Sequence, residues 1–169
     1  ALTAIRQISE MQVDVPMLAM THCDASKLAK QHGKKSEYAL CAAQWHKTLT
    51  YKDKFFGNGK KYDKDFTKEY DYAPPYQAAE SSAALLVWKD AFERANSFDT
   101  EKVRDALAKT DMQTFYGNIK FGSGGQNTAK PMVLFQVICD GDKCENKVVA
   151  PTKWASAKLV HPIPKWSER

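Results

Sequence analysis

The sequence predicts an α/β fold that closes with a C-terminal β-hairpin. Short apolar runs, typical of buried strands, alternate with amphipathic runs, typical of helices, through the first two thirds of the chain. The last third is strand-like, and its apolar runs flank Asp140-Gly141, which is a hairpin turn signal. Alternating helices and strands indicate helices packed on a sheet, so the α/β class follows from the order of the elements.

Composition excludes several classes of protein. The 169 residues are 43% hydrophobic and 27% charged, as in soluble globular proteins. No apolar run reaches the 18 or so residues of a membrane span, and no signal peptide is visible. The net charge of +5, from 25 basic and 20 acidic residues, is spread too evenly to indicate a nucleic-acid partner. We therefore expect a folded chain without a membrane span and without bound nucleic acid.

The first 43 residues predict two helices and two strands. Leu2 and Ile5 recur at helical spacing in the first helix. In the second helix, Asp24 is the expected N-cap and Gly33 the residue that follows the C-terminus. In chain order we expect a helix over 1–12, a strand over 13–20, a helix over 24–32 and a strand over 38–43.

The middle of the chain predicts three helices. Tyr62, Phe66 and Tyr70 recur every four residues and indicate an aromatic stripe, which either faces the core or forms a ligand platform. After the break at 73–75, the helix over 76–95 is apolar almost all round, so we expect it to be buried. A third helix follows, with Asp99 as its N-cap and Val103, Ala106 and Leu107 on its inner face.

The four cysteines fall into two pairs. Cys139 and Cys144 lie in CDGDKC, where residues of a short hairpin can face each other at disulfide distance. Free thiols, or one knuckle of a metal site, are the alternatives for this pair. For Cys23 and Cys41 we also expect a disulfide, although the sequence fixes no geometry there.

The cluster Thr21-His22-Cys23-Asp24 follows a predicted strand and precedes a predicted helix. Ligands bind at the carboxyl ends of strands in open α/β sheets, and a helix N-terminus offers free N–H groups to an anion. Three interpretations stay open: ligand contact, a structural turn with a disulfide-bonded Cys23, or a Cys-His nucleophile. Nearby Trp45 either lines a pocket or packs against the aromatic helix. The other histidines show no metal spacing, so we expect neither a metal nor a cofactor.

Several motifs in fixed order resemble one family. YQAA opens a long buried helix, DTEKVRDAL forms a capped helix, and the segments TFYGNIKF, GQN and KPMV follow. This series, with the ending VVAPTKWASAKLVHPIPKW, resembles the C-terminal half of the periplasmic substrate-binding proteins for branched-chain amino acids and amides. Those proteins feed ABC importers. The resemblance spans nearly the whole chain, and its motifs are structural rather than catalytic.

The resemblance implies part of a two-lobed fold, the periplasmic-binding-protein type 1 fold. Residues 1–55 would belong to lobe two, residues 56–128 to lobe one, and residues 129–169 to lobe two and the C-terminal tail. The implied partners are a small solute, an ABC permease in the membrane, and the missing N-terminal half of the same protein. The implied location is periplasmic or extracellular, a setting that paired cysteines fit although they depart from the usual family pattern.

The same resemblance implies a set of ligand-binding residues. Thr21 and His22 match a loop of lobe two in which an acidic residue often holds the ligand's ammonium group. Neither residue is acidic, and Asp24 is the candidate to replace that function. Tyr76 and Gln77 match the start of a helix that faces the cleft. We expect a non-enzymatic binder of an amino acid, an amide or a small carboxylate. A sensory or interaction module on the same fold, without transport, is the alternative.

Overall fold

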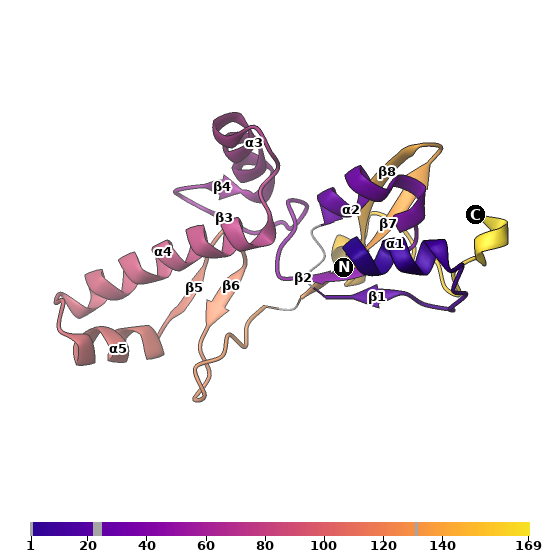
Figure 1. Ribbon diagram of the computed structural model, residues 1–169. Helices are drawn as coiled ribbons and strands as arrows, with labels where there is room; N and C mark the ends of the chain where they lie inside the picture. The colour runs from indigo at the N-terminus through magenta and orange to yellow at the C-terminus, as the bar shows by residue number, and fades with distance from the viewer. Residues whose placement is uncertain (1, 22–24, 131) are drawn as a thin grey trace. The chain divides into compact units, whose positions relative to one another are not determined.

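The computed structural model describes residues 2–21, 25–130 and 132–169, and the chain forms two compact units. The discontinuous unit contains Ala1–Ala43 and Met132–Arg169, and the inserted unit is Gln44–Pro131. Figure 1 shows the elements of each unit along the colour ramp of the chain. The first unit boundary follows Ala43, whereas the sequence predicts the change of lobe near residue 55. The assignment of residues to lobes stays a prediction.

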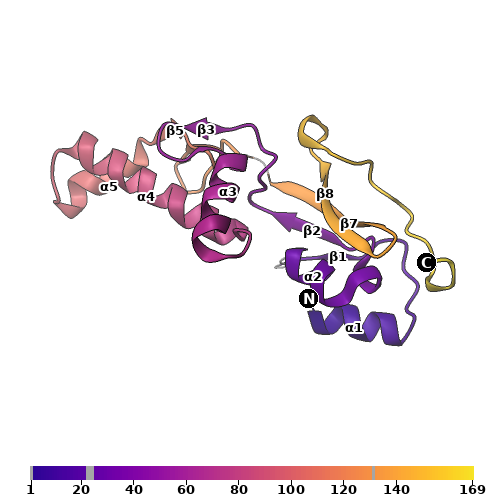
Figure 2. The same ribbon diagram turned by 90° about the horizontal axis from the view of Figure 1, so that it is seen from above.

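A four-stranded sheet organises the discontinuous unit. Its strand order is β1 (Ala19–Met20), β2 (Leu40–Ala43), β7 (Val133–Asp140) and β8 (Lys143–Ala150). β1 and β2 run parallel, and the remaining pairs are antiparallel. The predicted helices are confirmed as α1 (Leu2–Glu10) and α2 (Ala25–His32), which lie to one side of the sheet in Figure 2. The predicted α/β class with a closing hairpin is therefore confirmed.

The predicted strand over 13–20 is mostly wrong, because only its last two residues pair in the sheet. The backbone groups before them bind the C-terminal tail instead. Val13 O accepts a hydrogen bond from Trp166 Nε1 at 3.0 Å, and Pro16 O accepts one from Ile163 N at 3.0 Å. A contact between residues about 150 positions apart leaves no periodic signal in the sequence, so local patterning could not reveal it.

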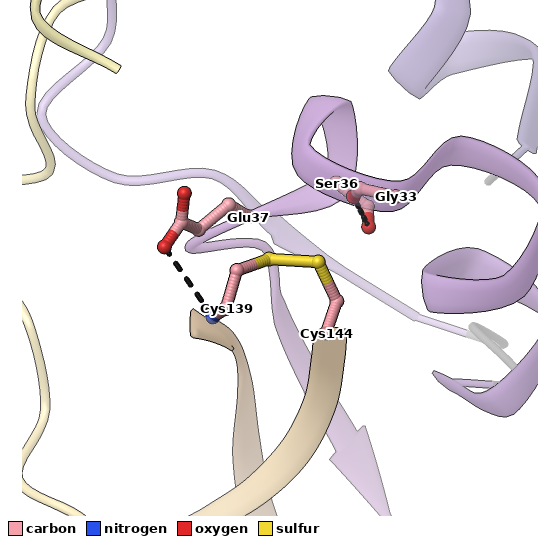
Figure 3. The surroundings of a disulfide bond; sticks show 5 residues. All are labelled: Gly33, Ser36, Glu37, Cys139 and Cys144. Carbon is pink, nitrogen blue, oxygen red and sulfur yellow. Dashed lines mark hydrogen bonds between the residues drawn. A yellow bond between two sulfur atoms is a disulfide. The ribbon is translucent and has the colours of Figure 1, made fainter. Parts of the chain in front are cut away.

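The predicted hairpin is confirmed and is longer than expected. β7 and β8 turn at Gly141, whose φ of 58° lies in the left-handed region. Cys139 and Cys144 face each other across the two strands and form a disulfide (Figure 3), which excludes the free-thiol and metal alternatives for this pair. Cys139 N also donates to Glu37 Oε1 at 3.3 Å. Cys41 is disulfide-bonded as well, whereas its predicted partner Cys23 lies outside the described residues.

One buried side chain joins the sheet of the discontinuous unit to the C-terminal tail. The amide of Gln136 is fully buried in β7, and its Nε2 donates to Tyr38 O and to Val160 O, both at 3.1 Å. Its Oε1 accepts from Val160 N at 2.9 Å. Every polar atom of this side chain therefore has a partner, as a buried amide requires. Two short 3₁₀ helices, η2 (Thr152–Trp154) and η3 (Trp166–Glu168), complete the tail.

The inserted unit consists of three helices and two short ladders. The sequence predicts α3 (Gly59–Tyr70), α4 (Tyr76–Ala95) and α5 (Thr100–Ala108) correctly. Asn58 caps α3 by accepting from Lys61 N at 2.9 Å, and the predicted cap Asp99 accepts from Lys102 N at 3.0 Å. The ladders pair β3 (Lys52–Asp53) with β4 (Gly57–Asn58) and β5 (Asp111–Gln113) with β6 (Asn118–Lys120). The sequence did not predict β3, β4 or β5.

An aromatic cluster forms much of the core of the inserted unit. Tyr62 of α3 stacks on the fully buried Phe115, with ring centroids 4.3 Å apart. Trp45 meets Tyr62 edge to face at 5.7 Å and is 4% exposed, so the packing alternative for Trp45 is confirmed. The predicted stripe is buried only at its start, because Tyr70 at its end is 57% exposed.

One face of α4 is exposed, and the expectation that this helix is buried all round is wrong. Ala83, Val87 and Ala91 are buried in the unit, but Leu85 is 68% exposed and Trp88 is 45% exposed. Trp88 stacks on Phe92, which in turn contacts Phe98, so apolar rings continue toward the end of the helix. In the described part of the chain, no helix combines the length and apolar character that crossing a membrane requires.

Candidate functional site

Of the predicted ligand residues in the discontinuous unit, only Thr21 is described. It is exposed and directly follows β1. Because β1 and β2 are parallel, their carboxyl ends meet at one edge of the sheet, and Thr21 lies at that edge. His22 and Asp24 lie outside the described residues, as does Cys23. The functional assignment of all four positions stays a prediction.

Tyr76 and Gln77 form the first turn of α4, as the sequence predicts. Tyr76 is half-buried and Gln77 is exposed. The N-cap residue is Pro75, whose side chain cannot accept a hydrogen bond. Among the described residues, none accepts a hydrogen bond from the backbone N–H of Tyr76 or Gln77. This 20-residue helix therefore begins with unsatisfied donors and the partial positive charge of its dipole.

A polar pocket of about 260 Å³ lies within the inserted unit. Its five lining residues come from four separate segments: Gln44 after β2, Glu80 one turn into α4, Tyr116 between β5 and β6, and Asn127 and Lys130 after β6. None of the predicted ligand residues lines this pocket. Tyr76 is nevertheless close enough for its hydroxyl to affect the pKa of Tyr116.

The ammonium group of Lys130 is the only positive charge among the lining residues. It donates a hydrogen bond to Gln44 O and lies 4.1 Å from the ring centroid of Tyr116. No carboxylate of the described residues forms an ion pair with it. Burial lowers the pKa of Lys130 to about 8, and the charge of Glu80 opposes that shift. The amine is therefore mostly protonated at pH 7, in surroundings that disfavour the charge.

The turn that carries Tyr116 is fixed from several directions. Asp53 Oδ2 accepts from Phe115 N at 2.7 Å, and Thr114 N donates to Gly117 O at 3.0 Å. A Cβ at Gly117 would lie 2.2 Å from Cδ of Lys130, so only glycine lets the lysine stem pass. Tyr116 is 6% exposed, and burial, followed by the charge of Glu80, raises the pKa of its hydroxyl. The phenol is therefore a hydrogen-bond donor at neutral pH.

Some hydrogen-bonding groups of this pocket have no partner among the described residues. Among the described residues, no hydrogen bond involves the Tyr116 hydroxyl or the side-chain amide of Gln44. Asn127, in contrast, is used structurally, because its Oδ1 accepts from Lys120 N and Ala129 N, both at 3.1 Å. The pocket therefore offers unused donors from three side chains and an acidic group, Glu80, which is itself exposed.

The pocket residues carry no sequence signal of a site. Tyr116, Asn127 and Lys130 lie in the motifs TFYGNIKF, GQN and KPMV, whose pattern indicates structure rather than ligand binding. Gln44 and Lys130 meet across 86 positions of sequence, and local patterning carries no signal for such a contact. Among the described residues, no three His, Cys, Asp or Glu side chains are grouped so that they could hold a metal ion.

Comparison with known protein families gives one match. The family model described as "Periplasmic binding protein" matches residues 1–143. This range includes the described residues predicted to bind ligand, all five pocket residues and most of the closing hairpin.

Comparison with solved structures indicates the same fold. A leucine-binding protein of Thermotoga maritima aligns with a TM-score of 0.66 and 22% identity over 89% of this chain. A periplasmic binding protein of Burkholderia mallei aligns with a TM-score of 0.72 and 17% identity over 94%. A branched-chain amino acid substrate-binding protein of Streptococcus pneumoniae, solved with isoleucine, gives 0.67 and 16% over 89%. The chain spans 41%, 44% and 42% of their respective lengths.

Proposed function

The chain belongs to the periplasmic binding protein family, and from this premise we propose that it is part of the solute-binding component of an ABC importer. The proposed solute is an amino acid, an amide or a small carboxylate, captured between two lobes. The observation that carries the proposal is the family match over residues 1–143, together with solved relatives named for branched-chain amino acid binding or transport. The proposed mechanism is closure of the lobes around the solute, without catalysis.

A cleft between two lobes needs polar groups from both walls, and this chain spans less than half of its solved relatives. The proposed partners are therefore the remaining part of the same protein, which supplies the second wall, and an ABC permease. The proposed location is periplasmic or extracellular. The exposed apolar side chains of Leu85 and Trp88 on α4 support a further partner, because large apolar groups that face solvent often mark an interaction surface.

The proposed solute contacts are Thr21, His22 and Asp24 from one unit, and Tyr76 and Gln77 from the other. The uncapped start of α4 supports Tyr76 and Gln77, because its free N–H groups suit an anionic group of a solute. Thr21 is supported by its position at the carboxyl end of β1.

The test is calorimetry on the complete protein with leucine, isoleucine, valine, acetamide and benzoate. We expect one class to bind at micromolar affinity, about −8 kcal/mol. Tyr76→Ala and Gln77→Ala should each lower that affinity roughly tenfold or more. Tyr72→Ala is the matched control, because this tyrosine is exposed and packs only at the far end of α3.

Two results would count against the proposal. If the complete protein binds none of these solutes, the solute-binding function is wrong for these classes. If it binds but Tyr76→Ala and Gln77→Ala have the affinity of the unmodified protein, the function stands and the site assignment fails. The sensory alternative predicts the same binding, and a permease gene beside the coding sequence would favour transport over it.

A further inference from the structure

The pocket of the inserted unit contains a cation that forms no ion pair with any described residue. Lys130 is half-buried, and its ammonium donates to the Gln44 carbonyl and lies over the Tyr116 ring, while the charge of Glu80 acts on it without an ion pair. An ammonium has three donors, so at least one stays available for a ligand. Taking a charge out of water is costly unless a counter-charge or several hydrogen bonds compensate. An anion that enters the pocket would supply that compensation.

The other free groups in the pocket also suit an anion. The Tyr116 hydroxyl is held in its protonated form, and the Gln44 amide has two N–H donors with no partner among the described residues. Three donors from three segments therefore line one space of about 260 Å³. That volume is below the roughly 300–1,000 Å³ of pockets for drug-sized ligands, so it suits a short molecule.

We propose that this pocket binds a short-chain carboxylate, whose oxygens accept hydrogen bonds from Lys130, Tyr116 and Gln44. Glu80 decides against a doubly charged phosphate, because one lysine cannot balance a dianion beside a carboxylate. All five lining residues belong to the inserted unit, so the pocket needs no second wall. It is a separate site from the proposed cleft contacts, none of which lines it.

The test is a titration with propionate, with propionamide and propylammonium as neutral and cationic probes of similar size. Binding is monitored by NMR through the amide resonances of residues 44, 116 and 117, both in the 169-residue chain and in the complete protein. We expect propionate to bind at millimolar affinity and the other two probes to produce no saturable shift. Resonances of the hairpin β7–β8 report in each sample whether the protein is folded.

Four variants sharpen the test. Lys130→Met keeps the aliphatic stem and should weaken propionate binding roughly ten- to hundredfold, because a charged hydrogen bond is lost. Tyr116→Phe should weaken it about two- to tenfold. Glu80→Gln, at an exposed position, should strengthen it about twofold, because a like charge is removed. Lys153→Met is the matched control, since Lys153 also lies over an aromatic ring, 3.8 Å from the centroid of Trp154, but outside the pocket.

The proposal is overturned if propionate and propionamide shift the same resonances equally, or if folded Lys130→Met binds propionate as well as the unmodified chain. If Lys130→Met does not fold, the proposal is tested by Glu80→Gln and Tyr116→Phe. Unchanged affinity for propionate in both variants would overturn it. Loss of this binding would leave the two-lobe function standing. Failure of the complete protein to bind amino acids or amides would not affect the pocket.

Discussion

The two units bury their apolar side chains with different secondary structure. In the discontinuous unit, a four-stranded sheet covers its helices, and the core residues Ile5, Leu28, Leu40 and Val137 are at most 2% exposed. In its described residues, 44–130, the inserted unit has three helices and two two-stranded ladders. Its apolar side chains gather in an aromatic cluster and along α5, and one face of α4 is left uncovered.

The exposed face of α4 shows what the composition of a helix can and cannot predict. α4 carries apolar side chains on two sides in its middle turns, so it needs packing partners on both sides to exclude water. On one side α5 and the aromatic cluster supply them, and Arg94 joins the two helices by donating to Ala106 O at 2.7 Å. On the other side Leu85 and Trp88 contact solvent. An apolar helix thus predicts that a partner is needed, and does not predict that the same chain contains it.

Loss of the aromatic core should have the largest effect. Phe115→Ala removes a fully buried ring that contacts Trp45, Phe56 and Tyr62, and we expect a loss of about 3–5 kcal/mol in the free energy of unfolding. Tyr70→Ala, in the exposed part of the same aromatic stripe, should change it by less than about 0.5 kcal/mol.

Hydrogen exchange measures this effect separately in each unit. We expect Phe115→Ala to lower the protection of amides in α3 and α4 and to leave β7 and β8 unchanged. Equal losses of amide protection in both units would contradict the view that their cores are separate, because the two units would then unfold as one.

A smaller loss of stability in the inserted unit should follow from lowering the pH. Burial, and then the charge of Lys47, lower the pKa of His46 to about 4 from an ordinary 6.5. Its Nδ1 accepts from Thr48 N at 3.4 Å, which requires the unprotonated atom. The folded state therefore binds fewer protons than the unfolded state between these values, so stability is full above pH 6.5 and falls as the pH drops toward 4.

The loss on acidification has an upper limit of about 3.5 kcal/mol, from roughly 1.4 kcal/mol for each unit by which the pKa of His46 is lowered. Urea unfolding at pH 7, 6, 5 and 4.5 measures it, with His46→Gln as the control that removes the titrating group. The same pH dependence in His46→Gln would assign the acid sensitivity to other groups.

The smallest effect on the chain itself should come from the uncovered face of α4. Leu85→Glu should change the stability of the 169-residue chain by less than about 0.5 kcal/mol, since the side chain is 68% exposed. In the complete protein the same change should cost at least about 2 kcal/mol if the proposed remaining part of the protein covers this face, because a carboxylate would then be buried. Lys64→Glu, at an exposed position of α3, is the control and should behave alike in both. Equal effects of Leu85→Glu in both contexts would show that nothing covers this face.

Local signals predicted much of the fold. Asp99 accepts from the third residue of α5, so the start of this helix could be predicted from residue type alone. Asp140-Gly141 fixed the hairpin turn, because glycine adopts the left-handed conformation required there. These features depend on neighbours within a few positions.

Long-range contacts account for what the sequence did not predict. The carbonyl groups of Val13 and Pro16 accept hydrogen bonds from a tail that lies about 150 positions later. The ladder of β3 and β4 has two residues a side, too short for a period to be recognised. The pocket requires Gln44, Tyr116 and Lys130 to meet, and nothing near any one of them indicates the other two.

The interruption of one unit by the other has a consequence for the order of folding during synthesis. The chain leaves the ribosome from its N-terminus, so β2 emerges before the inserted unit and its partner β7 emerges after it. The inserted unit is continuous and can fold first. The amide of Gln136 must wait longer still, because its acceptor and donor at Val160 are made 24 residues after it. The sheet of the discontinuous unit is therefore completed only after the whole inserted unit has been made.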